Sequence, residues 1–165
     1  SDTGASLRLP SSAKGVTGLN STWGRVSRNG IFPLAPSLDH IGPMTRSARD
    51  AAIILEAIAG HDPNDPTSAL EPVPRYSLQL RLETTPVVGF DRELAAEHFD
   101  DVTNEMLEST IEVLLDLGWR VLDVRTPGFA EAAQEWTALC GIETAGVHAE
   151  NYPSRSAEYG PDLDG

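Results

Sequence analysis

A strand–helix–strand pattern in the second half of the sequence restricts the fold class more than any other stretch. The short apolar run Pro86–Phe90 favours a strand, and Arg120–Val124 favours a second one. Between them lies a helix that Asp100 or Asp101 can cap. Its apolar stripe comprises Met106, Thr110, Val113, Leu114 and Leu117. Strands joined through a helix usually run parallel with a right-handed crossover, so the pattern predicts an α/β fold.

The chain divides into three sections along its length. Residues 1–60 begin with turns rich in Gly, Ser and Pro and end in a helix that Thr45 or Ser47 can cap. Residues 61–84 form a Pro- and Asp-rich connection that we expect to run over the surface. Residues 85–165 hold the strand–helix–strand pattern and one further helix.

Apolar periodicity predicts the helices outside that pattern. The helix before Gly60 carries a stripe of Ala51, Ile54, Leu55 and Ile58. Gly60 is expected to end it, because glycine adopts the left-handed cap conformation without a Cβ penalty. The last helix, at about 129–149, places on one face Phe129, Ala132, Ala133, Trp136 and Cys140. Near the start of the chain, residues 6–13 favour a short helix and residues 16–19 a strand.

Composition excludes several classes of function. The 12 basic and 25 acidic side chains give a net charge of −13, which argues against a surface for nucleic acid or anionic membranes. Residues 1–60 carry six bases and four acids, so the acidic excess lies after residue 60. The single cysteine, Cys140, excludes an intramolecular disulfide framework and a cysteine-based zinc cluster. Neither a membrane span nor a secretory signal is present, so we expect a cytoplasmic protein.

The first ten residues are the strongest candidates for chemistry. Ser6 follows two small residues at the expected start of a helix, so a substrate can approach it closely. The backbone N–H groups of Thr3, Gly4, Ala5 and Ser6 could converge on an oxyanion. The same spacing also fits an ordinary helix N-cap, and spacing alone leaves both interpretations open.

The longer sequence around Ser6 resembles that of the amidase signature family. Four stretches match family motifs in order. Residues 2–10 match Asp-Thr-Gly-Gly-Ser-x-Arg-x-Pro except at Ala5, and residues 15–22 match Gly-Val-x-Gly-Leu-Lys-Pro-Thr except at Asn20 and Ser21. Residues 24–28 match Gly-Arg-Val-Ser-Arg, and residues 37–44 match Ser-Leu-Asp-x-x-Gly-Pro-Met. The resemblance is strongest through about residue 70 and extends over essentially the whole chain. It implies part of a mixed-sheet fold with helices covering the sheet.

The resemblance also implies a reaction and a site. A serine matching Ser6 attacks a carboxylic amide, and water or another amine resolves the acyl-enzyme, with no metal or organic cofactor. The oxyanion-hole amides that it implies belong to Thr3, Gly4, Ala5 and Ser6, with Asp2 and Arg8 bracing the loop. The expected partner is a small-molecule amide whose identity the sequence does not give, and neither nucleic acid nor a membrane is expected.

This sequence departs from the family pattern in what accompanies Ser6. The bridging serine and the basic lysine of the family's Ser–Ser–Lys relay lie upstream of the matching element, and no such positions precede Ser1 here. We therefore expect an internal fragment that has no amidase activity alone. It would persist only with more of the enzyme or as an oligomer such as a homodimer. Ala5 stands where the family usually has Gly, and its methyl group can be accommodated if φ of Ala5 is negative. In addition, Asn20-Ser21-Thr22 replaces Lys-Pro-Thr.

Several other residues have a competing functional interpretation. Ser11 and the only lysine, Lys14, fit the S-x-x-K spacing of penicillin-recognising enzymes, but the supporting motifs are absent and Lys14 fits better as a surface residue. His40 could touch substrate, although a hydrogen-bonded structural histidine is favoured. Asp39 is interpreted as a bracing carboxylate, and Cys140 as a small core residue.

Two further functions remain open beside a stand-alone amidase. The parent could be an amidotransferase A subunit that acts on misacylated transfer RNA, since Gly-Arg-Val-Ser-Arg suits both. The net charge and the Phe-Pro-Leu-Ala-Pro text at 32–36 fit a stand-alone amidase better. Alternatively, the chain could be a non-catalytic scaffold that kept the family's fold.

Overall fold

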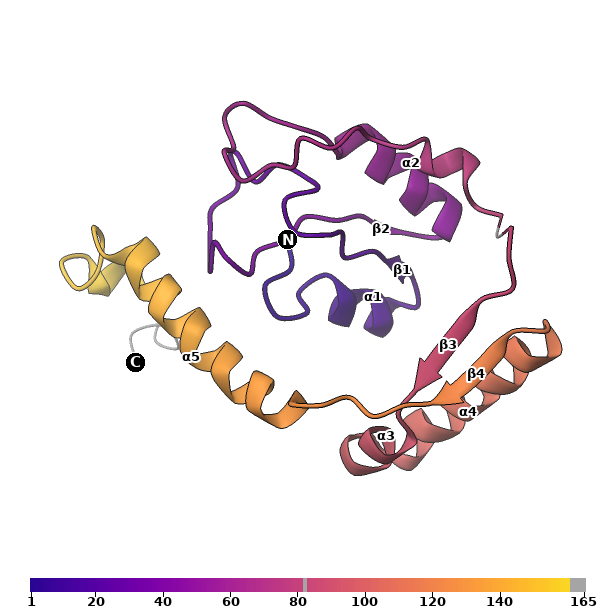
Figure 1. Cartoon of the computed structure of the whole chain (residues 1–165). Coiled ribbons are helices and arrows are strands. Elements are labelled where there is room, and N and C mark those ends of the chain that lie inside the picture. Colours follow the sequence, from indigo (N-terminus) through magenta and orange to yellow (C-terminus); the bar gives the residue numbers. More distant parts are fainter. Residues whose placement is uncertain (82, 161–165) are drawn as a thin grey trace. The chain divides into compact units, whose positions relative to one another are not determined.

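The chain separates into two compact units in a computed structural model that describes residues 1–81 and 83–160 (Figure 1). One unit combines Ser1–Leu80 with Gln134–Gly165, and the other is Arg81–Ala133. The end of the predicted section 85–165, residues 161–165, lies outside the described residues.

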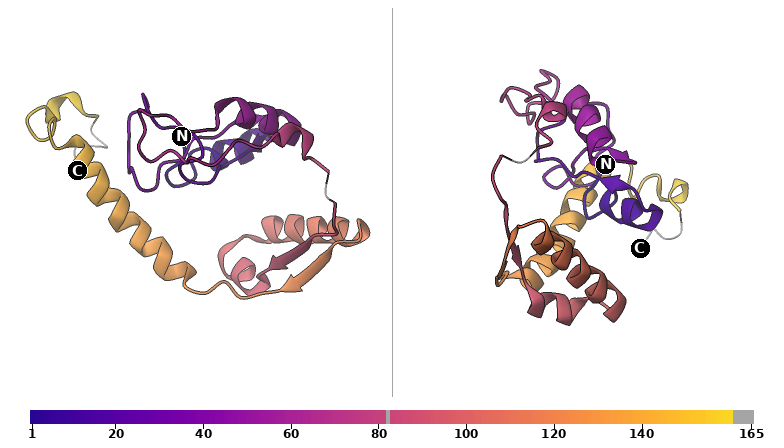
Figure 2. Two further views of the ribbon diagram at one scale, coloured as in Figure 1. Left: turned by 45° about the horizontal axis from the view of Figure 1, so that its top comes forward. Right: turned by 90° about the vertical axis from the view of Figure 1, so that its right-hand side faces the viewer.

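A parallel pair of strands forms the centre of the second unit. β3 (Val87–Phe90) pairs with β4 (Arg120–Asp123), and Val88 lies opposite Val121 in the register. Two helices lie between these strands in the chain, and the longer one, α4 (Asp101–Asp116), lies alongside the pair in both views of Figure 2. The predicted α/β class and the predicted parallel pairing are therefore confirmed.

Aspartate side chains begin both helices of this unit. Asp91 accepts the N–H of Leu94 at 3.0 Å and caps α3 (Arg92–His98). Asp100 accepts the N–H of Thr103 at 2.7 Å and caps α4 (Asp101–Asp116), so the first of the two predicted caps is the one used. Such caps satisfy N–H groups that the first turn of a helix leaves without partners.

Two predicted apolar stripes are only partly buried. In α4 the buried residue is Ile111, flanked by the half-buried Leu107 and Leu114, whereas the exposed members of the predicted stripe are Met106, Thr110, Val113 and Leu117. In α2 (Ala48–Ile58) the buried residues are Ala51, Ala52 and Leu55, while Ile54 and Ile58 are exposed. Helical period therefore identified the helices correctly but not all of their packed faces.

The first unit contains a short helix, a small antiparallel pair and α2. α1 (Arg8–Lys14) and β1 (Thr17–Gly18) fall within or beside the predicted segments 6–13 and 16–19. β1 pairs with β2 (Met44–Thr45), with Thr17 opposite Thr45. α1 and α2 both contact elements of this pair, which places the start of the chain next to the core of the unit.

The two ends of α2 follow different rules. Ser47 accepts the N–H of Asp50 through Oγ at 3.1 Å, so the predicted serine cap is confirmed. At the other end the cap residue is Ala59, which is extended, with φ −76° and ψ 154°. Gly60 follows with φ +130°, so it permits the turn after the helix but is not the left-handed cap that was predicted.

Most of the last helix and most of the long connection belong to the first unit. α5 (Phe129–His148) lies where the sequence predicts it, and η2 (Ser156–Glu158) follows. The connection 61–84 is largely exposed but contains the short helix η1 (Tyr76–Leu78) and two buried polar residues, Asp65 and Ser68. Within the described residues, no helix combines the length and the apolar character that crossing a membrane requires.

Candidate active site

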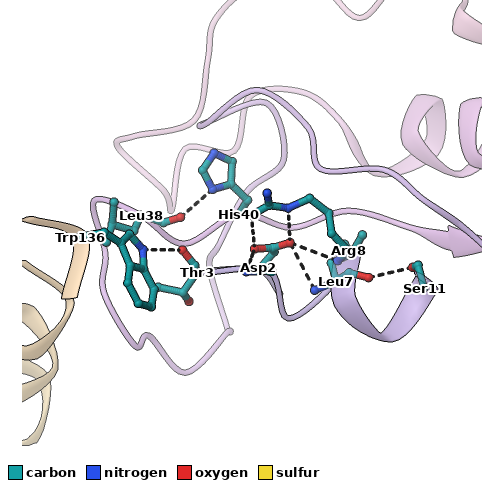
Figure 3. A network of polar contacts seen from close by, with 9 residues as sticks. Asp2, Thr3, Leu7, Arg8, Ser11, Leu38, His40 and Trp136 are labelled. Atoms are coloured by element: carbon teal, nitrogen blue, oxygen red, sulfur yellow. Dashed lines mark hydrogen bonds and ion pairs between the residues drawn. The ribbon is translucent and has the colours of Figure 1, made fainter. Parts of the chain in front are cut away.

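The carboxylate of Asp2 organises the segment that contains Ser6 (Figure 3). Asp2 is only 1% exposed and accepts the N–H of Ala5 at 2.7 Å and those of Leu7 and Arg8 at 3.3 Å. The guanidinium of Arg8 donates to the same carboxylate from Nε at 3.0 Å and from Nη2 at 3.2 Å. These bonds fix the backbone on both sides of Ser6.

The charge of Asp2 is stabilised by these same donors. Burial of the carboxylate acts to raise its pKa, because the charged form loses hydration. The hydrogen bonds from the Arg8 side chain and from the N–H groups of Ala5, Leu7 and Arg8 together outweigh this effect and lower the pKa to about 2. Asp2 is therefore ionised at neutral pH and accepts every one of these bonds as a carboxylate.

His40 holds the backbone of Asp2 from the other side. The two residues exchange backbone hydrogen bonds, with Asp2 donating at 2.8 Å and His40 donating at 2.9 Å. Nδ1 of the His40 ring lies 2.6 Å from the carbonyl oxygen of Leu38 (Figure 3). The ring of His40 therefore has a hydrogen-bond partner in the protein, as the structural interpretation predicts.

Thr3 is tied to the loop that precedes His40. Its hydroxyl donates to the carboxylate of Asp39, which is 5% exposed. Asp39 also accepts the N–H of Leu34 at 2.9 Å and that of Ala35 at 3.3 Å. Asp39 therefore braces the Ser6 segment through Thr3, which confirms its interpretation as a bracing carboxylate.

Trp136 of α5 contacts the same segment, a role that sequence reasoning missed. Its indole Nε1 donates to the carbonyl oxygen of Thr3 at 3.2 Å (Figure 3). The ring also fills the space beside Gly4, since a Cβ added to Gly4 would lie 2.7 Å from Cη2 of Trp136 and closer still to Cζ2. The two contacts join positions more than 130 residues apart, and the apolar face of α5 was the only sequence signal for them.

Two further residues anchor α5 to the loop that Asp39 braces. Glu143 accepts the N–H of Ser37 at 2.8 Å and also its hydroxyl. The hydroxyl of Thr144 donates to the carbonyl oxygen of Leu34 at 3.2 Å. The helix that carries Trp136 is thus held against residues 34–37 by its own side chains.

Ala5 and Ser6 have unusual local geometry. Ala5 has φ +124°, so the negative φ expected to accommodate its methyl group is not adopted, because the Asp2 bond to its N–H sets the turn. Ser6 is exposed, and its hydroxyl has no hydrogen-bond partner among residues 1–81 and 83–160. Over the same residues the N–H groups of Thr3, Gly4 and Ser6 donate to no protein acceptor, whereas that of Ala5 is already used by Asp2.

The residues of the alternative S-x-x-K interpretation do not meet. The hydroxyl of Ser11 is buried and donates to the carbonyl oxygen of Leu7 at 2.7 Å. Lys14 is exposed in the last turn of α1, as expected for a surface residue. The Ser11 hydroxyl is therefore used in a hydrogen bond to a backbone carbonyl four residues earlier and is not paired with Lys14 as the S-x-x-K interpretation requires.

A pocket of about 690 Å³ lies along α5 and shares Trp136 with the Ser6 segment. Its walls, all within the first unit, also include Phe32 and Leu34 near the start of the chain and Cys140, His148 and Tyr159 near its end. Cys140 thus lines a pocket and is half-buried, which corrects its interpretation as a core residue. In the described part of the chain no three His, Cys, Asp or Glu side chains are arranged to hold a metal ion.

Comparisons with known proteins agree on one family. Residues 1–160 match the protein family described as Amidase. A Mycobacterium tuberculosis protein named "Putative amidase AmiD" is 48% identical over 98% of this chain and 34% of its own length. The A subunit of the glutamyl-tRNA(Gln) amidotransferase of Gloeobacter violaceus is 46% identical over 88% of this chain and 30% of its own length. The solved native peptide amidase from Stenotrophomonas maltophilia has a TM-score of 0.73 at 31% identity, covering 91% of this chain and 32% of that one. The chain therefore spans about a third of the length of these relatives.

Proposed function

Because the chain belongs to the amidase family, we propose that the protein carrying it hydrolyses a carboxylic amide through an acyl-enzyme on Ser6. The observation that supports Ser6 most strongly is its setting. It is an exposed serine whose hydroxyl has no hydrogen-bond partner in the described part of the chain, and the residues before it are fixed by Asp39, His40 and Arg8. A nucleophile needs this combination of access and a rigid support.

The proposed reaction proceeds in two halves. Oγ of Ser6 attacks the carbonyl carbon of the amide, its proton passes to a base, and the carbonyl oxygen becomes an oxyanion. Collapse of this intermediate breaks the C–N bond, and the leaving amine takes up a proton. Water then attacks the ester carbonyl, which releases the carboxylic acid and restores Ser6. The base is the bridging serine and lysine of the family's relay, since Lys14 makes no contact with Ser6 in the described residues.

The oxyanion is proposed to bind to backbone amides of the same segment. The N–H groups of Thr3, Gly4 and Ser6 are the available donors, because none of them has a protein acceptor within the described residues. Ala5 is assigned to bracing instead, because its N–H lies 2.7 Å from Oδ1 of Asp2. Backbone donors fixed in advance stabilise the developing charge without reorganising during the reaction.

A second candidate is an amidotransferase A subunit that acts on misacylated transfer RNA. It is favoured by the 46% identity to the Gloeobacter violaceus protein. Its acyl-serine chemistry would be the same, but the ammonia released from the first amide would attack an activated carboxyl group of the aminoacyl moiety on the transfer RNA and displace its leaving group. The net charge of −13 counts against direct binding of nucleic acid by this part of the protein.

Hydrolysis assays on the full-length protein test the proposal. Simple carboxylic amides and glutamine are supplied to the unsubstituted protein, to Ser6→Ala and to Ser12→Ala, which alters an exposed serine of α1. We expect Ser6→Ala to lower kcat by about a thousandfold or more and Ser12→Ala to have little effect. Turnover that survives Ser6→Ala would contradict the proposal, and turnover of glutamine alone would favour the second candidate. The 165-residue chain by itself is expected to be inactive.

A further inference from the structure

We propose that Trp136 is a positioning residue for the oxyanion site: its indole holds the Thr3–Gly4 peptide so that the Gly4 N–H faces the substrate carbonyl oxygen. This inference rests on the proposed function. Trp136 does not touch the reacting atoms in this account, and it acts through the peptide that it contacts.

The first argument comes from peptide geometry. The Thr3–Gly4 peptide bond is trans, so its C=O and N–H lie in one plane and point in opposite directions. Trp136 Nε1 donates to the carbonyl oxygen of Thr3 at 3.2 Å. Fixing this oxygen also fixes the direction of the Gly4 N–H, which points away from the Thr3 carbonyl oxygen and therefore away from the indole. Within the described residues this N–H has no protein acceptor.

The second argument comes from packing. The six-membered ring of Trp136 occupies the position that a Cβ of Gly4 would take. The ring therefore blocks rotation of the peptide toward α5, while Gly4 itself stays exposed to an approaching substrate. Only glycine at position 4 leaves room for the indole ring, so this packing contact requires both Gly4 and Trp136.

The third argument is that the indole is itself held in place. Glu143 and Thr144 bind α5 to residues 34–37, and Asp39 binds the same loop to the hydroxyl of Thr3. The Thr3–Gly4 peptide thus lies between two supports that are joined to each other. A hydrogen bond from a fixed donor defines an orientation, whereas one from a mobile side chain would not.

The exposure of Trp136 separates this role from a purely structural one. The residue is 38% exposed, whereas a tryptophan that served only the core would be largely buried. Loss of the indole N–H should therefore affect the reaction much more than the thermal stability of the protein.

The test uses the full-length protein with Trp136→Phe, which keeps an aromatic ring and removes the N–H. Trp119→Phe, in the other unit, is the matched control. A second variant, Trp136→3-benzothienylalanine, replaces the N–H by sulfur with almost no change of shape. For each protein kcat, KM, the melting temperature and the affinity for a boronate that mimics the tetrahedral intermediate are measured.

We expect both Trp136 variants to lower kcat and the boronate affinity by about tenfold or more, as for a weakened oxyanion donor. KM should stay within about twofold, and the melting temperature should match that of Trp119→Phe. An unchanged kcat in the benzothienylalanine variant, or a loss of kcat that only follows a fall in melting temperature, would overturn the inference. If the unsubstituted protein shows no Ser6-dependent turnover, the proposed function fails and the inference fails with it. If Ser6-dependent turnover is present and Trp136→Phe retains it, the inference alone fails.

Discussion

The backbone conformation of Ala5 is set by hydrogen bonds to neighbouring residues. Its N–H is held by the Asp2 carboxylate, and its carbonyl oxygen accepts the N–H of Leu9 at 2.7 Å in the first turn of α1. Meeting both bonds places φ at +124°, a region that side chains with a Cβ rarely adopt. The backbone at Ala5 is therefore strained, directly before the proposed nucleophile.

The strain at Ala5 predicts a stabilising substitution. Ala5→Gly should raise the free energy of unfolding by about 1 kcal/mol, because glycine adopts positive φ without a steric penalty. Ala13→Gly is the matched control, since Ala13 lies inside α1, where glycine costs about 0.5–1 kcal/mol. Urea denaturation of the full-length variants measures both effects. Equal destabilisation by both substitutions would contradict the backbone strain assigned to Ala5.

The lowered pKa of Asp2 predicts a dependence of stability on acid. Its folded pKa of about 2 lies below that of an unfolded aspartate, so the folded state binds fewer protons between these values. The resulting stabilisation, on the order of 2 kcal/mol, is fully present above about pH 4 and is lost as the pH falls toward 2. The difference in unfolding free energy between the unsubstituted protein and Asp2→Asn should therefore shrink as the pH falls from about 4 to about 2. A difference in unfolding free energy that does not change with pH would contradict the role assigned to the Asp2 carboxylate.

At this scale the sequence predicted the residues near Ser6 better than those far from it. Asp2, Arg8 and Asp39 belong to short motifs, and the structure brings them to Ser6 as neighbours in the chain or through one loop. Trp136 and Glu143 could not be predicted, because their contacts depend on where a distant helix docks. Periodicity shows that a helix has an apolar face but not which backbone that face will meet.

Helix α4 shows the same distinction for whole elements. The helix, its aspartate cap and its place between two parallel strands all follow from sequence pattern. Its packed face does not, because two apolar stripes run along it with nearly the same spacing. One contains Leu107, Ile111 and Leu114, and the other contains Met106, Val113 and Leu117. Only the position of β4 in the folded chain selects the first.

Substitutions in α4 test which stripe is packed. Ile111 is 6% exposed, so Ile111→Ala should destabilise the protein by about 2–5 kcal/mol through loss of burial and a residual cavity. Thr110→Ala, at the neighbouring exposed position, should change stability by less than about 0.5 kcal/mol. Thermal unfolding followed by circular dichroism measures both. Equal effects of the two substitutions would mean that the packed face has been assigned incorrectly.

For the whole molecule, both the exposed apolar side chains and the greater length of the relatives indicate that further residues of the full-length protein pack against this chain. Val102, Met106, Val113 and Leu117 form an exposed row on α4, and Ile54 and Ile58 are exposed on α2. The chain spans about a third of the relatives that it matches. We expect further residues of the full-length protein to cover these rows, since contiguous apolar surfaces usually mark contacts.

The family was predicted from four motifs in order, and the match over residues 1–160 confirms it. The arrangement of the site was not predictable in the same way. The motifs show which residues belong together, but the contacts among Thr3, Asp39 and Trp136 arise only from the folded first unit. The central claim that remains to be tested is that Ser6 forms the acyl-enzyme.

Labelling of the full-length protein with a fluorophosphonate tests that claim most directly. Such a probe phosphonylates an activated serine, and mass spectrometry of proteolytic peptides locates the adduct. We predict one adduct on the peptide that carries Ser6, absent from Ser6→Ala and retained in Ser12→Ala. An adduct on another serine, or an unlabelled Ser6 in a protein that still hydrolyses amides, would contradict the account.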